Sequence, residues 1–188
     1  IKMISYLTFD VGTTAIKTCV FDEKLRILSK RSDEYDLLTE GDLVELKPET
    51  YWETMKKAVK RAAEEFSFAG LKAICLTTQG ETIIPVDRDG RALSNAVVWL
   101  DQRAKKQAEE INGVLDSMGE KVLFHTTGLP EMNGYTPLAK YLWFKEETPE
   151  LYDKTWKLLL LEDYLIYRLT GKAVSEKSLL SSTAWFAI

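Results

Sequence analysis

Short apolar runs separated by polar turns open the chain and predict three strands in hairpin succession. The first two runs, Tyr6–Asp10 and Thr18–Asp22, are joined by a segment rich in glycine and threonine. A polar turn at Glu23 and Lys24 then leads into a third run, Leu25–Ser29. Because apolar runs of this length bounded by turn residues are typical of strands, we expect antiparallel neighbours here.

The pattern changes to a helical period at Pro48, where apolar residues begin to recur at spacings of three and four. This stripe predicts a helix that ends before Gly70 and packs one face inward. Its members are Trp52, Met55, Val59, Ala62, Ala63 and Phe66. The next run, Leu71–Thr77, is almost continuously apolar, which is typical of a strand buried on both faces in a mixed or parallel sheet.

The second half of the chain alternates strands and helices. Two runs, Thr82–Asp87 and Ala96–Leu100, flank an Asp-Gly turn and predict a hairpin or an insertion. The remaining predicted elements are a charged surface helix over Asp101–Met118, a helix from Pro137 to Pro149, a strand over Leu158–Leu161 and a short helix over Asp163–Leu169. With no repeat or flexible linker in the sequence, this order predicts one α/β domain over residues 1–188.

Composition narrows the class of partner. The 188 residues are 45% apolar and 11% aromatic, which is enough for one filled core and argues against disorder. The formal net charge is -4, from 25 basic and 29 acidic residues spread along the chain. Since the sequence has no basic stripe to bind phosphate backbones, we expect a small-molecule partner and no nucleic acid.

Cysteines and the longest apolar stretch bear on the compartment. Cys19 and Cys75 lie inside apolar runs, which suits buried thiols in a reducing compartment better than a disulfide. The longest apolar stretch, 156–169, is interrupted by charged residues and is unable to span a bilayer. The first residues show no export-signal pattern. The sequence therefore predicts a cytoplasmic protein without a membrane partner.

A turn between the first two predicted strands has the chemistry of a phosphate site. It runs from Asp10 to Lys17, with Gly12 permitting a tight turn before Thr13 and Thr14. Amide hydrogens, threonine hydroxyls and the lysine ammonium can neutralise phosphate oxygens, and the aspartate can hold Mg²⁺ through water. A plain hairpin with an exposed lysine is the alternative, because motifs this short also occur by chance.

The pattern Asp-x-Gly-Thr-Thr-x-x-Lys resembles the first phosphate-binding hairpin of the actin-like, ribonuclease H-like ATPase superfamily. Further segments narrow the resemblance to the FGGY carbohydrate kinases, the family of the glycerol kinases and xylulokinases. In the order and at the spacing of that family, they are Thr77–Thr82, Ala96–Ala104, Thr127–Pro130, Glu162–Gly171 and Ser178–Ile188. The resemblance covers nearly the whole chain. It implies a mixed five-stranded sheet with flanking helices, with ATP and Mg²⁺ as cofactors.

The resemblance also implies a pocket for a sugar or polyol, which needs fixed hydrogen-bonding groups and a flat apolar wall. In glycerol kinases the residues that match Glu81 and Tyr135 contact the substrate, and the tryptophan that matches Trp99 packs on its carbon backbone. The expected pocket residues are Gln79, Gly80, Glu81, Trp99, Asp101 and Tyr135. We expect the phosphate loop to face the same cavity as Glu81.

Each pocket residue also has a structural alternative. Trp99 can be a core residue, and Glu81 can be a solvated carboxylate at a strand end. Asp101 with Arg103 can form a helix start with a surface ion pair. His125 has no metal-ligand partners at a recognisable spacing, so a structural role is expected for it.

One departure from the family pattern concerns the substrate. Gly80 stands where glycerol kinases have an arginine, which removes a hydrogen-bond donor for glycerol. Nor does the pair Gly80-Glu81 match the methionine-histidine pair of xylulokinases. The substrate is therefore expected to be another polyol or a ketose, with space at the glycine for a larger molecule.

The resemblance assigns no catalytic residue to this chain. In family members the aspartate base lies beyond the position of Ile188, and an adenine-binding second domain follows. We therefore expect residues 1–188 to be an incomplete N-terminal kinase domain with little activity, and exposed sheet edges are compatible with a homo-oligomer. The alternatives are a non-catalytic sugar-binding or regulatory module and an ATPase related to the heat-shock or actin group.

Overall fold

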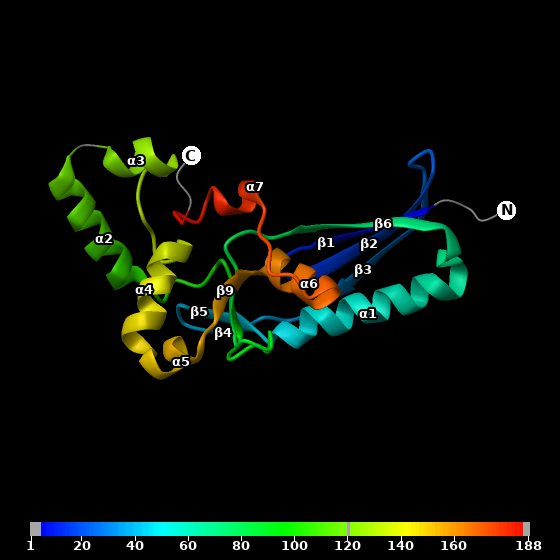
Figure 1. The fold of residues 1–188 in the computed structure, drawn as a ribbon, viewed down its shortest axis with the longest axis horizontal. Helices are drawn as coiled ribbons and strands as arrows, with labels where there is room; N and C mark the ends of the chain where they lie inside the picture. The colour runs from blue at the N-terminus through cyan, green and yellow to red at the C-terminus, as the bar shows by residue number, and fades with distance from the viewer. Residues whose placement is uncertain (1–4, 120, 186–188) are drawn as a thin grey trace. The chain divides into compact units, whose positions relative to one another are not determined.

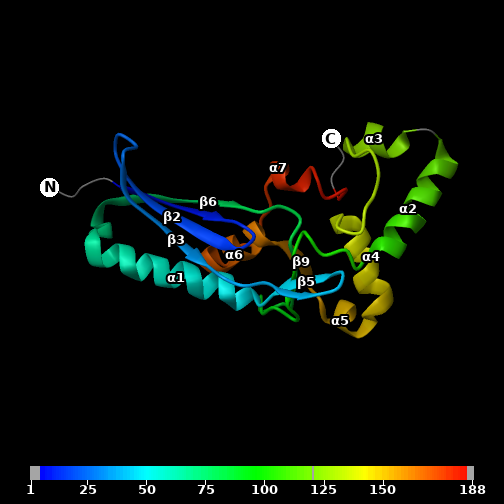
Figure 2. The same cartoon turned by 180° about the vertical axis from the view of Figure 1, so that it is seen from behind.

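The computed structural model describes residues 5–119 and 121–185, and contacts divide the chain into two compact units. The first unit consists of Ile1–Leu37 and Lys47–Gln79, and the second of Leu38–Leu46 and Gly80–Ile188. Figure 1 labels their elements, and Figure 2 shows them from behind. The sequence pattern did not indicate this division, and the assignment of all residues to one domain stays a prediction.

A mixed four-stranded sheet is the framework of the first unit. Its strands, in spatial order, are β3 (Ile27–Glu34), β2 (Ala15–Asp22), β1 (Ser5–Val11) and β6 (Leu71–Thr78). β2 is antiparallel to both β1 and β3, whereas β6 is parallel to β1. The three hairpin-linked strands and the mixed sheet are thus confirmed. The strand count is corrected, because the described residues of this sheet supply four strands rather than five.

Helix α1 (Pro48–Glu65) covers one face of this sheet, as both Figure 1 and Figure 2 show. Pro48 occupies the first helical turn, where its missing amide hydrogen removes no helical bond. Met55 and Ala62 of the predicted stripe are buried and thus confirmed, whereas Tyr51 and Ala58 are buried in place of the predicted Trp52 and Val59. The buried alternate residues of β1 and β2 that share one sheet face are Leu7, Phe9, Val11, Ile16 and Val20.

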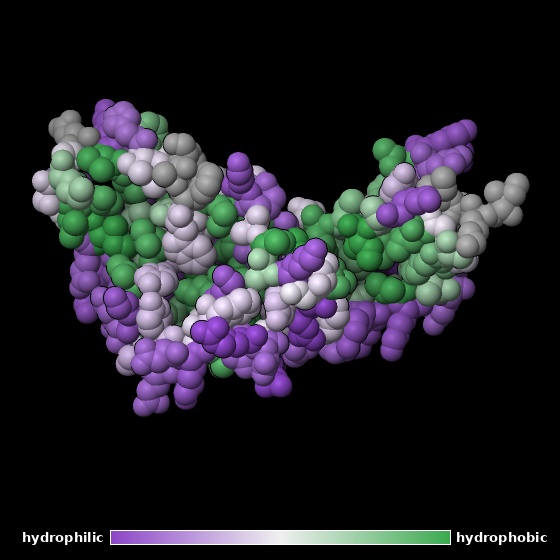
Figure 3. All heavy atoms as spheres, viewed as in Figure 1, coloured by the Kyte–Doolittle hydropathy of each residue, from purple (hydrophilic) through white to green (hydrophobic). Residues whose placement is uncertain are grey.

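Strand β6 differs from its prediction. It lies at the edge of the sheet, and most of its side chains are exposed or half-buried, including Ile74 at 43% exposure. Cys75 is likewise exposed, so its prediction as a buried thiol is wrong, whereas Cys19 is half-buried. Figure 3 shows hydrophilic residues along the outer side of α1 and hydrophobic residues where β6 runs. An apolar run predicts a strand, but its burial depends on what covers it.

Five short strands form an antiparallel sheet in the second unit. In spatial order they are β4 (Leu38–Glu40), β5 (Leu43–Leu46), β8 (Ala96–Val97), β7 (Ile83–Val86) and β9 (Lys157–Leu160). The pairing of β7 with β8 confirms the second predicted hairpin, although the two strands meet at a single residue pair, Ile83 and Val97. The sequence pattern did not indicate β4 and β5.

The second unit also contains helices. In chain order they are α2 (Lys105–Met118), α3 (Val122–Thr127), α4 (Pro137–Glu147), α5 (Pro149–Lys154), α6 (Leu161–Thr170) and α7 (Lys177–Leu180), while η1 (Phe68–Gly70) belongs to the first unit. α4 confirms the helix predicted from Pro137, and α2 begins later than the predicted Asp101. Within the described ranges, no helix combines the length and the apolar character that crossing a membrane requires.

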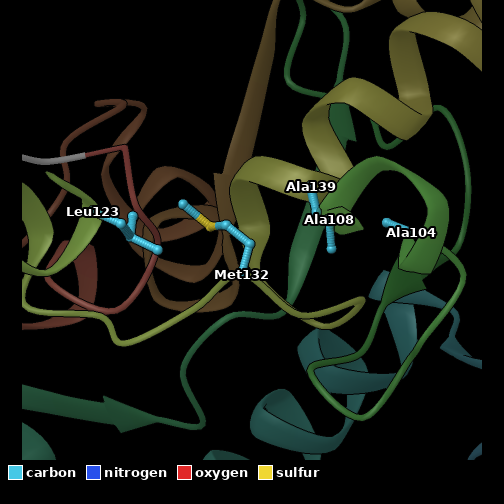
Figure 4. Close-up of a cluster of buried hydrophobic side chains, with 5 residues drawn as sticks. All are labelled: Ala104, Ala108, Leu123, Met132 and Ala139. Atoms are coloured by element: carbon cyan, nitrogen blue, oxygen red, sulfur yellow. The ribbon is translucent and has the colours of Figure 1, made fainter. Parts of the chain in front are cut away.

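A buried cluster joins α2 to α4. Its members, drawn in Figure 4, are Ala104, Ala108, Leu123, Met132 and Ala139. Ala108 of α2 lies beside Ala139 of α4, and their short side chains let the two helices approach closely. This contact holds the N-terminal part of α4, which bears on the candidate site because that helix directly follows Tyr135.

Candidate functional site

The predicted phosphate loop is a tight turn between β1 and β2. The amide of Gly12 donates a hydrogen bond to the carbonyl of Ala15 at 2.9 Å, and a Cβ atom at Gly12 would lie 3.2 Å from that oxygen. Asp10 and Lys17 face each other across the two strands. Their carboxylate and ammonium groups are 3.4 Å apart, with both side chains at least half exposed. The turn therefore presents one acidic and one basic group together.

Two tyrosines that the sequence pattern did not indicate support this loop. The hydroxyl of Tyr35 donates a hydrogen bond to the carbonyl of Gly12, and the amide of Tyr35 donates to the carbonyl of Thr14 at 2.9 Å. The ring of Tyr35 packs edge-on against that of Tyr51, with 5.3 Å between centroids. Burial raises the pKa of both tyrosines above the ordinary value, so both hydroxyls stay protonated near pH 7.

Gln79 belongs to the loop side of the site. Its amide donates to the carbonyl of Val11 at 2.9 Å, and its side-chain nitrogen donates to the hydroxyl of Tyr51 at 3.0 Å. It follows β6, the strand that lies parallel to β1, so both strands end beside the phosphate loop. The carboxyl ends of neighbouring parallel strands are the usual ligand sites of such sheets. This residue was predicted for the sugar pocket, and the structure places it in the first unit.

Glu81 of the second unit has an unusual backbone conformation. Its φ angle is 61°, in the left-handed region that residues other than glycine rarely adopt. Such strained positions are concentrated at functional sites. Burial raises the pKa of the Glu81 carboxyl, while a hydrogen bond with Ser182 and the charge of Lys140 act in the opposite direction. Glu81 is half-buried, and both its role in the pocket and the alternative of a solvated carboxylate at a strand end stay predictions.

The two predicted aromatic residues of the pocket are both partly exposed. Trp99 is 37% exposed and its amide donates to the hydroxyl of Thr82 at 3.1 Å, so the alternative that it is only a core residue is wrong. Tyr135 is 36% exposed, and its hydroxyl accepts a hydrogen bond from Asn133 at 2.9 Å. Exposed rings on a held backbone are suited to pack against the carbon atoms of a ligand.

Asp101 is buried rather than exposed in a pocket. Its side chain is fully buried, and its oxygens accept hydrogen bonds from the amide of Val44 at 2.7 Å and from Arg103 at 2.8 to 3.0 Å. Arg103 also contacts Glu45 at 2.6 Å. Asp101 therefore fixes the β5 segment to the chain after β8. The predicted ion pair with Arg103 exists, but it is buried and not on the surface.

Lys140 of α4 is a buried charge that the sequence analysis missed. It is fully buried, and its ammonium group donates to the carbonyl of Val98 at 3.0 Å and to that of Trp99 at 3.4 Å. Burial lowers the pKa of Lys140 to about 8, with the charge of Arg103 adding to this effect, whereas Asp101 and Glu81 act to raise it. Its only sequence signal was its position on the inward face of the predicted helix.

The structure thus separates the predicted residues into two groups. Asp10, Gly12, Thr13, Thr14, Lys17 and Gln79 lie in the first unit, and Gly80, Glu81, Trp99, Asp101 and Tyr135 lie in the second. That both groups face one cavity stays a prediction. Two hollows described within the second unit, of about 620 Å³ against α2 and α3 and about 630 Å³ against α5, contain none of these residues.

Asp10 has the character of a Mg²⁺ ligand that acts through water. It offers a half-exposed carboxylate at the carboxyl end of β1, beside the tight turn. Mg²⁺ commonly uses one or two carboxylates together with water and substrate phosphates. Over residues 5–119 and 121–185, no group of three or more His, Cys, Asp or Glu side chains could hold a metal ion. The magnesium site therefore stays a prediction.

Comparisons with known proteins bear on the family and the fold of this chain. Residues 5–188 match the model of the N-terminal domain of the FGGY family of carbohydrate kinases. The chain is 26% identical to a xylulose kinase of Staphylococcus xylosus over 187 residues, covering 99% of this chain and 38% of that protein. It is 33% identical to a glycerol kinase of Thermococcus gammatolerans over 189 residues, covering 97% of this chain and 37% of that protein.

Solved structures show the same fold. A ligand-bound xylulose kinase from Lactobacillus acidophilus superposes with a TM-score of 0.87 at 25% identity, covering 98% of this chain and 36% of that one. Plasmodium falciparum glycerol kinase with ADP gives a TM-score of 0.80 at 25% identity, covering 100% and 38%. The chain therefore spans well under half the length of the proteins that it matches, and its α/β, actin-like fold class is confirmed.

Proposed function

Because this chain belongs to the FGGY family of carbohydrate kinases, we propose that it forms part of an enzyme that phosphorylates a hydroxyl group of a sugar or polyol with ATP. The chain supplies the first phosphate loop and most of the sugar pocket. The observation that carries this proposal is the family match over residues 5–188, which includes both the turn after β1 and the segment around Glu81.

The phosphate loop would act on the transferring phosphoryl group. Lys17 supplies a positive charge, and the backbone amides and threonine hydroxyls of the turn supply hydrogen-bond donors. Asp10 would hold Mg²⁺ through water, and the ion would supply charge neutralisation between the β- and γ-phosphates. Groups arranged in advance around developing charge lower the barrier because they need little reorganisation during the reaction.

The second unit would hold the acceptor. Glu81 can accept hydrogen bonds from two hydroxyl groups, and the exposed ring of Trp99 can pack on the C-H face of the sugar. Tyr135 would add a further hydroxyl contact. Gln79 would contribute from the loop side rather than from the second unit. Asp101 would act through the backbone that it holds, since its oxygens are occupied.

Gly80 supports an acceptor larger than glycerol. A Cβ atom placed at Gly80 would meet only Leu179, at 3.9 Å, so the site has room for a side chain. The φ angle of Gly80 is not in the left-handed region, so the backbone does not require a glycine either. The missing side chain therefore leaves space that a ketose or a longer polyol can fill.

We assign no catalytic base to residues 1–188. The reaction requires a group that takes the proton of the acceptor hydroxyl within hydrogen-bonding distance. In the second unit, Glu81 is the half-buried carboxylate proposed to bind the sugar, and Asp101 is committed to Arg103. The catalytic base and the adenine-binding part are therefore not assigned to the described residues. The homo-oligomer stays a prediction.

The test uses the whole protein that the gene encodes. It is incubated with MgATP and a panel that includes glycerol, D-xylulose, D-gluconate and longer polyols, and ADP formation is measured. Turnover that requires both Mg²⁺ and one of these acceptors supports the kinase. Saturable sugar binding without any phosphoryl transfer would instead support the alternative, a non-catalytic sugar-binding module. Neither binding nor turnover with any acceptor would contradict both.

A further inference from the structure

Tyr135 is an exposed residue on a segment that is otherwise largely buried. It belongs to residues 131–136, which lead into α4 and which we call the Tyr135 loop. Its two neighbours, Gly134 and Thr136, are buried, and so is Met132 of the cluster in Figure 4. Connecting segments usually run over the surface, because their backbone polar groups need partners. The contacts that hold this loop therefore decide where its tyrosine lies.

The side chain of Asn112, in the middle of α2, holds the loop by two hydrogen bonds. Its amide nitrogen donates to the carbonyl of Met132 at 3.0 Å, and its oxygen accepts from the amide of Met132 at 2.9 Å. Both groups of one side chain are thus paired with both backbone groups of one residue, 20 positions further along the chain. Two such bonds fix the direction of the loop as well as its distance from α2.

Gly134 lets the loop lie directly against the start of α2. A Cβ atom at Gly134 would lie 2.8 Å from the carbonyl oxygen of Gln102 and 3.1 Å from the backbone nitrogen of Lys105. Because the first distance is too short for a real contact, any side chain here would push the loop away. The loop is therefore held against the α2 segment at two places, both before Tyr135.

The loop also closes into a turn around Tyr135. The amide of Thr136 donates to the carbonyl of Asn133 at 2.9 Å, and the amide of Asn133 donates to the hydroxyl of Thr136 at 3.0 Å. The side chain of Asn133 donates to the hydroxyl of Tyr135 at 2.9 Å. The tyrosine is thus held at its backbone and at its hydroxyl. Such preorganisation lowers the entropy cost of binding a ligand.

Asn112 is an unfavourable residue for its place in a helix. Asparagine is a poor helix former because its side chain competes with the backbone for hydrogen bonds. Gly113, which follows it in α2, is also poor, and a Cβ atom there would meet no described atom within 4 Å. Packing thus gives no reason for Gly113, whereas Asn112 has its contact with the loop. The contact explains an asparagine that helix propensity disfavours.

We propose that Asn112 is a positioning residue of the sugar pocket: through the backbone of Met132 it holds the Tyr135 loop against α2, so that the tyrosine is presented to the sugar in one place. The inference rests on the proposed function, in which Tyr135 contacts the acceptor. Asn112 itself lines the hollow of about 620 Å³, which contains none of the predicted pocket residues. It therefore acts through the loop and not by touching the sugar.

The first test measures the hold on the loop and needs no sugar. Asn112→Leu keeps a similar volume, removes both hydrogen bonds and introduces a better helix former. Hydrogen–deuterium exchange of the whole protein is followed by mass spectrometry in peptides from the Tyr135 loop and from α4. Exchange in the loop is expected to become about tenfold faster, while that of α4 stays unchanged. A loop that exchanges at the wild-type rate would overturn the inference.

The second test is a double-mutant cycle on sugar affinity, measured by calorimetry with D-xylulose and glycerol as probes. Asn112→Leu alone is expected to weaken sugar binding about tenfold, because the tyrosine is displaced. In the Tyr135→Ala background the same substitution should change the affinity by less than about twofold, since the residue through which it acts is gone. Additive losses in the double variant would contradict the proposal.

Matched variants separate positioning from a general loss of stability. Leu115→Ala removes packing on the same buried cluster but no hydrogen bond to the loop, so sugar affinity should stay within about twofold of wild type. Gly134→Ala should weaken sugar binding as Asn112→Leu does, whereas Gly113→Ala, at an exposed position of α2, should not. A loss of sugar affinity in Leu115→Ala equal to that in Asn112→Leu would reduce Asn112 to a structural role and contradict the proposal.

The kinetics of ATP and a second variant complete the design. The KM for ATP is expected to stay within about twofold of wild type in Asn112→Leu, since the phosphate loop belongs to the other unit. If Asn112→Leu does not fold, Gly134→Ala displaces the loop instead, and unchanged loop exchange and sugar affinity in that variant would overturn the inference. If the wild type binds no sugar but Asn112→Leu speeds loop exchange, the proposed function fails while the hold of Asn112 on the loop stands.

Discussion

The turn after β1 and the segment after β8 each place an aspartate near the end of an apolar strand, and the two aspartates have opposite surroundings. Asp10 of the first unit is half exposed, with Lys17 at 3.4 Å as its partner. Asp101 of the second unit is fully buried and accepts hydrogen bonds from Val44 and Arg103. The first carboxylate is therefore open to ligands, whereas the second holds the protein together.

This difference shows how each unit builds its part of the site. The phosphate loop is formed by residues close in sequence, and its charged groups contribute little to stability because water competes for them. The pocket is formed by residues far apart in sequence, since 57 positions separate Val44 from Asp101 and 41 separate Trp99 from Lys140. Its buried polar contacts must all be satisfied, because each unpaired group is costly.

The largest expected effect comes from breaking the buried pair. Asp101→Ala leaves Arg103 buried with Glu45 as its remaining acidic contact and removes the acceptor of the Val44 amide. The free energy of unfolding is expected to fall by about 3 to 5 kcal/mol, as measured by urea denaturation. Asp116→Ala, at an exposed position of α2, is the matched control and should change it by less than about 0.5 kcal/mol. A loss below about 1 kcal/mol for Asp101→Ala would contradict the structural role.

The matching substitution in the first unit should have the reverse profile. Asp10→Asn is expected to lower kcat of the whole enzyme by about 10² to 10³-fold, because the phosphoryl group loses its proposed magnesium contact. The unfolding free energy should change by less than about 1 kcal/mol, since the pair with Lys17 is exposed. Steady-state kinetics and denaturation measure the two effects, with the exposed Asp36→Asn as a control. Full activity of Asp10→Asn would contradict the proposed role of Asp10 in phosphoryl transfer.

These profiles explain how far the sequence could predict the site. The loop was recognisable because Asp10, Gly12 and Lys17 are neighbours along one hairpin, whose strand pairing is local. The role of Asp101 was not recognisable, because Asp-x-Arg after an apolar run occurs both on surfaces and in buried pairs. Only the packing of β5 against this segment decides between the two, and the sequence pattern did not indicate β5.

The fold shows the same limit. The three hairpin strands and α1 follow from local periodicity, and the structure confirms them. The apolar run of β6 correctly predicted a strand. Its predicted burial on both faces is wrong, because β6 lies at the edge of the described sheet and its side chains are exposed or half-buried. Lys140 and Tyr35 were missed for a related reason, since their partners lie more than 20 positions away.

Buried charge in the second unit should also make stability depend on pH. The pKa of Lys140 is lowered from 10.5 to about 8 in the folded chain, so the unfolded chain binds more protons between these two values. The free energy of unfolding therefore rises with pH through that window, by on the order of 3 kcal/mol relative to a variant without this group. Denaturation of wild type and Lys140→Met at a series of pH values measures the difference, and two parallel curves would contradict it.

The smallest expected effect concerns the tyrosine beneath the phosphate loop. Tyr35→Phe removes the donor to the carbonyl of Gly12 but keeps the ring that packs on Tyr51. Because one neutral hydrogen bond contributes about 1 kcal/mol, the unfolding free energy should fall by about that amount. The KM for ATP should rise several-fold as the turn loses its support, while sugar affinity stays unchanged.

Tyr141→Phe, which removes a hydroxyl contact with Tyr152 in the second unit, is the matched control. If both variants raised the KM for ATP equally, the loop would have no special dependence on Tyr35, and this long-range contact would not distinguish the loop from the pocket.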